Sequence, residues 1–155
     1  MRRGLYAELG ACAPDPDVQS VSVHAGVITA KKKISATSIY FQSLPYKVHH
    51  ETGLIDREEL RKSALVFRPA LIICGASAYP RVLDFAKFRA ICDEVGALLM
   101  ADIAHISGLV ATGVHPAPFA HCDVSTTTTN TSLRSPRAGM IFFKHTEKTT
   151  DIEDR

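Results

Sequence analysis

An aspartate and a histidine stand three residues apart, Asp102 and His105, directly after the apolar run 97–101. An aspartate at the end of a buried strand would suit a cationic partner such as a protonated ring nitrogen, since a charge leaving water needs an opposite charge. An imidazole one turn further on could hydrogen-bond a phenolic oxygen of a ligand. Two structural roles stay open: Asp102 could cap a following helix, and His105 could be a hydrogen-bonded core residue.

More polar side chains follow in the same half of the chain. The run Thr126–Thr129 is typical of a β-branched strand. Arg134 and Arg137 flank a Ser-Pro turn, where either guanidinium could hold an anion or form a surface salt bridge. From the types and spacing of its residues, this segment predicts a site for a small aromatic or anionic cofactor.

The elements that would position these residues alternate between strands and helices. Continuous apolar runs predict buried strands, and the strands are expected at 71–75, 97–101, 123–128 and 139–143. A capping box formed by Asp56 and Glu59 stands before a helical stripe and predicts a helix from Asp56 to the residue before Pro69. Apolar residues at three- and four-residue spacings predict a second helix over Asp84–Val95. This pattern predicts an α/β fold with a mostly parallel sheet and flanking helices.

Ligands of open parallel sheets bind beyond the carboxyl ends of the strands. Four of the polar residues lie at or just past such an end, so we expect them along one rim: Ser77, Asp102, His105 and Thr128. Residues 1–20 show no periodicity, so we expect a poorly anchored N-terminal lead segment there. The polar tail 146–155 is expected to fray.

Composition excludes several classes of protein. The chain has 155 residues, 46% of them apolar, and a net charge of +2, which is too small to argue for nucleic acid or an anionic membrane as partner. No apolar run approaches the roughly 18–20 residues of a membrane span, and no secretory signal is evident. The histidines show no zinc spacing, and neither a dinucleotide, a Walker A nor a serine-hydrolase signature is present.

The four cysteines, Cys12, Cys74, Cys92 and Cys122, contain no C-x-x-C pair. Buried, reduced thiols are therefore expected, in a reducing compartment. A cytoplasmic location follows, with a mitochondrial one as the alternative.

Three segments carry a resemblance to a known family: K-K-K-I-S-A-T-S-I-Y-F-Q-S-L-P-Y-K-V, A-D-I-A-H-I-S-G-L-V-A-T-G-V-H-P-A-P-F-A-H-C and T-T-T-T-N-T-S-L-R-S-P-R-A-G-M-I-F-F. The sequence resembles serine hydroxymethyltransferase, also called glycine hydroxymethyltransferase, a fold-type I (aminotransferase-like) pyridoxal phosphate enzyme. The match runs from about Gly26 to Phe143. It implies that residues 21–145 form part of a pyridoxal phosphate-dependent transferase large domain.

The resemblance also implies roles for single residues. Asp102 falls where the family's aspartate pairs with the pyridinium nitrogen, and His105 where a histidine contacts the phenolic oxygen. Ser77 matches a serine near the cofactor ring. Thr128 and Arg137 match a threonine and an arginine around the Schiff-base lysine.

Two departures from the family pattern concern catalysis. The family reads T-T-T-T-H-K-T-L-R-G, but here Asn130 stands in place of the histidine and Thr131 in place of the Schiff-base lysine. A threonine hydroxyl cannot form an imine, so no covalent cofactor binding and no intact catalytic residue are expected. Upstream, Ser22 takes the place of a ring-stacking histidine, with His24 out of register.

The resemblance covers only the middle of the family's length, so the sequence predicts a truncated, catalytically incompetent relative. Its family activity would be the interconversion of serine and glycine with tetrahydrofolate, in one-carbon metabolism. Two further interpretations stay open. The chain could be a non-catalytic binding or regulatory fragment that docks on full-length family subunits, or it could bind pyridoxal phosphate weakly and non-covalently through Asp102 and His105.

Overall fold

A sheet of six strands forms the centre of the molecule in the computed structural model, which describes residues 3–6, 28–29, 32–33, 42–49, 51–75, 77 and 79–144. Its strands are β1 (Arg3–Tyr6), β4 (Gln42–Leu44), β5 (Leu71–Gly75), β6 (Leu98–Asp102), β7 (Val124–Thr128) and β8 (Gly139–Phe143). The helices are α2 (Arg57–Phe67), α3 (Phe85–Val95) and α4 (Ser107–Ala111). A separate antiparallel pair joins β2 (Ile28–Thr29) and β3 (Lys32–Lys33).

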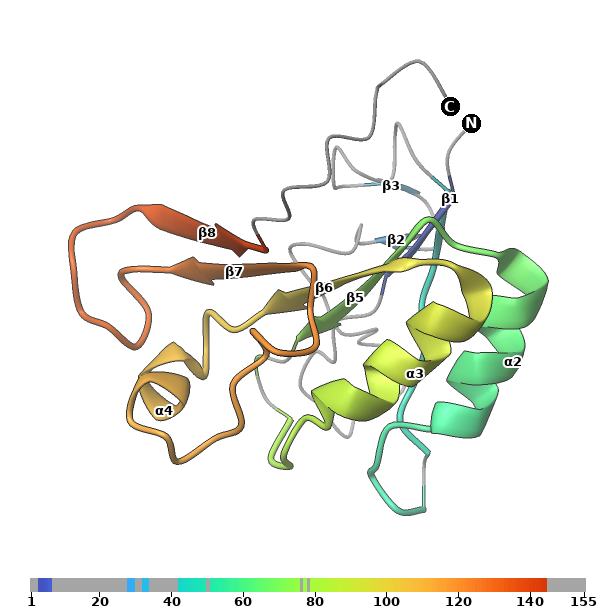
Figure 1. The fold of residues 1–155 in the computed structure, drawn as a ribbon, viewed down its shortest axis with the longest axis horizontal. Coiled ribbons are helices and arrows are strands. Elements are labelled where there is room, and N and C mark those ends of the chain that lie inside the picture. The colour runs from blue at the N-terminus through green and yellow to red at the C-terminus, as the bar shows by residue number, and fades with distance from the viewer. Residues whose placement is uncertain are drawn as a thin grey trace.

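The strand order is β4-β1-β5-β6-β7-β8. Neighbours from β4 to β7 are parallel, and β8 pairs antiparallel with β7 at one edge. Helices α2 and α3 contact each other, and α3 packs against the central strands β5 and β6 (Figure 1). The predicted α/β fold, a mostly parallel sheet with flanking helices, is confirmed.

One strand comes from the segment expected to be a poorly anchored lead. Residues Arg3–Tyr6 form β1, which lies between β4 and β5 and pairs with both. A strand this short contains too few positions for its periodicity to stand out in the sequence. The boundaries at residues 20 and 145 stay predictions, because the residues on either side of position 20 and the tail 146–155 lie outside the described residues.

Both long helices begin where the sequence predicts. The Asp56 carboxylate accepts a hydrogen bond from the Glu59 backbone N–H at 2.9 Å, and the Asp84 carboxylate accepts one from the Lys87 N–H at 3.2 Å. These bonds satisfy N–H groups that the first turn of a helix leaves without a partner. Helix α3 ends at Gly96, whose φ of 71° is readily adopted by glycine.

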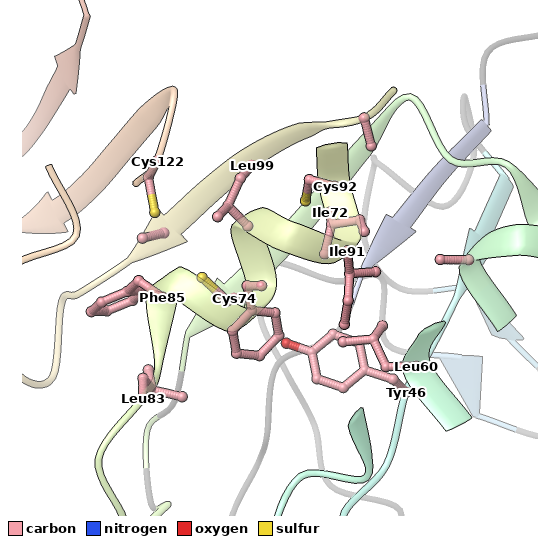
Figure 2. Packing of buried hydrophobic residues seen from close by; sticks show 14 of the residues in the cluster. Tyr46, Leu60, Ile72, Cys74, Leu83, Phe85, Ile91, Cys92, Leu99 and Cys122 are labelled. Atoms are coloured by element: carbon pink, nitrogen blue, oxygen red, sulfur yellow. The ribbon is translucent and has the colours of Figure 1, made fainter. Parts of the chain in front are cut away.

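The core lies between the sheet and helices α2 and α3 (Figure 2). Fully buried side chains come from both layers, and the largest of them include Leu60, Ile72, Leu83, Phe85 and Leu99. Tyr46 joins this cluster, and its buried hydroxyl donates a hydrogen bond to the Ile73 carbonyl at 3.1 Å. Burial of these apolar surfaces is the main force that holds the helices on the sheet.

The described cysteines are buried and unpaired. Burial raises the pKa of the Cys92 thiol to about 12. A hydrogen bond with Cys122, together with burial, raises the pKa of Cys74 well above its usual value. The thiols of Cys74 and Cys92 are therefore protonated and unreactive at neutral pH. The prediction of buried, reduced thiols is confirmed for these cysteines, and Cys12 lies outside the described residues.

A half-buried ion pair ties α3 to the starts of β6 and β7. Asp123 Oδ2 accepts hydrogen bonds from the Leu99 N–H at 2.7 Å and from Arg89 Nη1 at 2.8 Å. Arg89 Nη2 donates to the Ala97 carbonyl at 2.9 Å. One carboxylate thus fixes a helix and a strand at once, and its loss would leave two donors without their acceptor.

We expect Asp123→Ala to lower the free energy of unfolding by about 1–3 kcal/mol, because it leaves Arg89 Nη1 and the Leu99 N–H without their acceptor. Urea unfolding of the full chain measures the change. Asp93→Ala is the matched control, since Asp93 also lies 2.8 Å from Arg89 but is 67% exposed, against 34% for Asp123. The control should lose less than about 1 kcal/mol. Equal losses in the two variants would contradict the bracing role of Asp123.

Gly75 allows β5 to approach β6 closely at its carboxyl end. It pairs in register with Asp102, and a Cβ at position 75 would lie 2.7 Å from the Asp102 carbonyl oxygen and 3.1 Å from its Cβ. Real Cβ atoms do not approach backbone this closely, so a side chain at this position would displace Asp102.

Gly75→Ala should therefore lower the unfolding free energy by about 1–3 kcal/mol through overpacking. Gly139→Ala provides a matched control in another strand, because its Cβ would meet only the Thr127 carbonyl oxygen at 3.8 Å, an ordinary contact. We expect the control to stay within about 0.5 kcal/mol of the parent chain. Thermal unfolding compares the two, and a neutral Gly75→Ala would show that β5 can move away from Asp102.

Candidate functional site

The carboxyl ends of β5, β6 and β7 lie at the same edge of the sheet. These strands are parallel neighbours, and Asp102 pairs in register with Gly75 on one side and with Thr126 on the other. Ser77 follows β5 by two residues and is exposed, while Thr128 is the last residue of β7 and is half-buried. The structure therefore brings the predicted rim residues to one edge.

Asp102 closes the turn that follows β6. Its Oδ1 accepts a hydrogen bond from the Ala104 N–H at 3.0 Å, and the side chain is half-buried. The cap of helix α4 itself is Ile106, so Asp102 caps the turn rather than the helix. A carboxylate can accept more hydrogen bonds than this one, so the turn contact is compatible with a cationic ligand nitrogen as a further partner.

His105 lies in the same turn and is exposed. The interpretation of His105 as a core residue is therefore wrong, because its ring does not enter the packed interior. An exposed imidazole at the rim is open to a ligand and can donate or accept a hydrogen bond there.

Thr126 adds a polar group that sequence reasoning treated only as part of a strand. Its residue pairs directly with Asp102, so both side chains project from the same face of the sheet. The Thr126 hydroxyl oxygen is buried and has no hydrogen-bond partner within the described part of the chain. A buried polar atom without a partner is unfavourable, and a ligand that offered one would relieve this.

Position 131 lies in the loop after β7. The hydroxyls of Thr131 and Thr128 are 2.6 Å apart, a hydrogen bond in which either can donate, and Asn130 and Thr131 are both exposed. The base of this loop is closed by Thr129, whose N–H donates to the Ala138 carbonyl at 3.0 Å. The side chain at position 131 is thus held at the end of β7 by a hydroxyl pair.

Ser132 and Ser107 form a further contact that sequence reasoning did not identify. Their hydroxyl oxygens are 2.6 Å apart, and Ser132 Oγ also accepts a hydrogen bond from the Gly108 N–H at 3.2 Å. The two serines are 25 residues apart in the chain, so no local sequence signal could have paired them.

The two arginines of the Ser-Pro segment are exposed at the far end of this loop. Arg134 has a left-handed φ of 53°. Among the described residues, no carboxylate pairs with Arg134 or Arg137, so the expected surface salt bridge is not seen there. Either guanidinium group could hold an anion.

The rim therefore offers a defined set of chemical groups. It has one carboxylate for a cationic nitrogen, one imidazole, and several hydroxyls that can bond ligand oxygens. It has no amine at position 131. Within the described ranges no cluster of histidine, cysteine or acidic side chains is suited to hold a metal ion, and no helix is long and apolar enough to cross a membrane.

Ser22 and His24, where the family pattern has its ring-stacking histidine, lie outside the described residues.

Comparison with known proteins shows the family to which the chain belongs. The chain matches the serine hydroxymethyltransferase family over residues 20–155. It is 63% identical over 121 residues to serine hydroxymethyltransferase 4 of Arabidopsis thaliana. This match covers 78% of this chain and 26% of the relative. It is 60% identical over 119 residues to serine hydroxymethyltransferase of Bombyx mori, a match that covers 77% of this chain and 26% of the relative. It is 56% identical over 126 residues to the cytosolic serine hydroxymethyltransferase of Oryctolagus cuniculus, a match that covers 81% of this chain and 26% of the relative. The chain spans about a quarter of the length of these relatives. It belongs to the serine hydroxymethyltransferase family.

Proposed function

We propose that this chain retains the ring contacts of a pyridoxal phosphate site but does not bind the cofactor covalently, and therefore does not interconvert serine and glycine with tetrahydrofolate. Thr131 carries this proposal, because it occupies the Schiff-base lysine position of the family and its hydroxyl is bonded to Thr128 at 2.6 Å. A hydroxyl cannot replace the lysine amine in this role.

The residues of the rim fit the cofactor in part. Asp102 could pair with the pyridine nitrogen and His105 with the phenolic oxygen. The Thr126 hydroxyl beside Asp102, which has no hydrogen-bond partner among the described residues, supports a ligand at this place. Ser77, Thr128 and Arg137 are the further contacts that we propose for the bound cofactor. When bound covalently, the cofactor supplies an electron sink for substrate carbanions, and the missing amine removes this anchor.

Location and small-molecule partners follow from the same assignment. We propose a cytoplasmic chain, which the cytosolic relatives and the buried free thiols support. Pyridoxal phosphate, bound without a covalent link, is its expected ligand. Serine, glycine and tetrahydrofolate are the substrates of the family. The chain would bind them at most, and it would not convert them.

Borohydride trapping tests the proposal. The purified chain is mixed with pyridoxal phosphate, reduced and mapped by peptide mass spectrometry, and no adduct should appear on the peptide that contains Thr131. Thr131→Lys should gain an adduct at residue 131, because it restores the amine at the end of β7. Turnover of serine with tetrahydrofolate by the parent chain would contradict the proposal.

Lys62, an exposed residue of α2, serves as an internal reference, because pyridoxal phosphate also reacts with surface amines. Adduct at residue 131 is scored relative to adduct at Lys62. In the Thr131→Lys chain, the further change Asp102→Ala should lower the ratio about tenfold if Asp102 contacts the ring nitrogen. An unchanged ratio would show that the lysine reacts as an ordinary surface amine.

A second candidate function is docking on full-length serine hydroxymethyltransferase subunits. The observation that favours it is the edge strand β8, where Ile141 is 68% exposed and Phe143 is 70% exposed. The strand pairs only with β7 in the described structure and so presents backbone hydrogen-bonding groups beside apolar side chains. Exposed apolar edges of this kind bind other protein surfaces.

Co-expression with a tagged full-length family member tests docking. The chain should co-purify with that subunit, and Ile141→Lys combined with Phe143→Lys should reduce recovery about tenfold by placing charges in the contact. Val66→Lys is the control, because Val66 is an 85% exposed apolar residue on α2, away from β8. Recovery that is equal for all three chains, or absent for the parent, would rule out docking through β8.

A further inference from the structure

Helix α4 lacks a side-chain cap of its own. The residue at its N-cap position is Ile106, which makes no side-chain hydrogen bond to the helix. The first turn of any helix leaves N–H groups that need acceptors. Here the Gly108 N–H donates to Ser132 Oγ at 3.2 Å, so a residue from the loop after β7 caps the helix.

The same hydroxyl contacts two other groups. Ser132 Oγ is 2.6 Å from Ser107 Oγ and 3.4 Å from the Ala104 carbonyl oxygen. A serine hydroxyl can donate one hydrogen bond and accept two. In one arrangement Ser132 donates to Ala104 and accepts from Gly108 and Ser107, which uses this full capacity; in the other, Ser107 donates to the Ala104 carbonyl at 3.4 Å and Ser132 donates to Ser107.

Ala104 links this contact to the rim. Its N–H is the donor that the Asp102 carboxylate accepts at 3.0 Å, and its carbonyl is the acceptor for Ser132. His105 is the next residue. Ser132 therefore touches the very turn that carries Asp102 and His105.

The neighbouring residue fixes the other side of the loop. Thr131 is bonded to Thr128 at the end of β7, while Ser132 is bonded to the turn after β6 and to the start of α4. Position 131 is therefore anchored through its own hydroxyl on one side, and the residue that follows it is anchored on the other.

We propose that Ser132 is a positioning residue, which holds the side chain at position 131 at a fixed place relative to Asp102 and His105. The consequence for ligand binding rests on the cofactor site proposed above. The hydrogen bonds of Ser132 do not depend on that site.

Hydrogen exchange on the full chain tests the positioning without any cofactor. Ser132→Ala should accelerate exchange about tenfold at the Gly108 amide and in the turn after β6, and leave the amides of β5 unchanged. Ser132→Thr should restore the parent rates, because it keeps the hydroxyl. Ser135→Ala is the control, since Ser135 lies in the same loop and, within the described residues, makes a hydrogen bond only through its backbone N–H, to the Thr129 carbonyl. Unchanged exchange at Gly108, or equal acceleration in β5, would overturn the proposal.

A second measurement separates positioning from a merely structural role. In the Thr131→Lys chain, Ser132→Ala should lower the borohydride-trapped adduct at residue 131 about tenfold relative to that at Lys62, and Ser132→Thr should recover it. Equal ratios for the alanine variant and its parent would refute the positioning of residue 131. If Thr131→Lys alone gives no adduct at residue 131, the proposed cofactor site fails, while the exchange measurement still decides whether Ser132 fixes the loop.

Discussion

The close approach of β5 to β6 at Gly75 is the constraint on which the rim depends. Asp102 has its position because the strand beside it carries no side chain at the paired residue, where a Cβ would lie 2.7 Å from the Asp102 carbonyl oxygen. The next strand pairs with Asp102 through Thr126. Three strand ends are thereby held in register, and the candidate site residues between Ser77 and Ser132 lie in these strand ends or in the segments that follow them. Disturbing this register would move the whole rim together.

Much of the fold could be predicted because local signals agree with the tertiary structure. Apolar runs at 71–75 and 139–143 became β5 and β8, and Asp56 and Asp84 cap the helices whose starts they predicted. The strand β1 was not predicted, because four residues show no periodicity and gain their place only by pairing with strands that are distant in the chain. A C-G-A-S segment did hold a signal for the close approach, since glycine inside a strand marks such a contact.

The site was harder to predict than the fold, for a physical reason. Asp102 and His105 stand out because of their types and spacing, but the core interpretation of His105 could be rejected only when its exposure was known. Ser132 and Ser107 meet only after the sheet forms. The burial of the Thr126 hydroxyl without a hydrogen-bond partner among the described residues also depends on the packed structure. Asp102 served both as a cap and as a candidate ligand, and the structure shows that the cap contact involves one of its two oxygens, Oδ1.

Hydroxyl side chains make the contacts that hold the loop after β7 in place. Position 131 carries a hydroxyl and no amine, and its loop is anchored through Thr128 on one side and through Ser132 on the other. These contacts are made by short hydroxyl side chains. The backbone of the rim is therefore held partly by the side chain of Thr131, through Thr128, and partly by Ser132, whose hydrogen bonds do not involve the side chain at position 131.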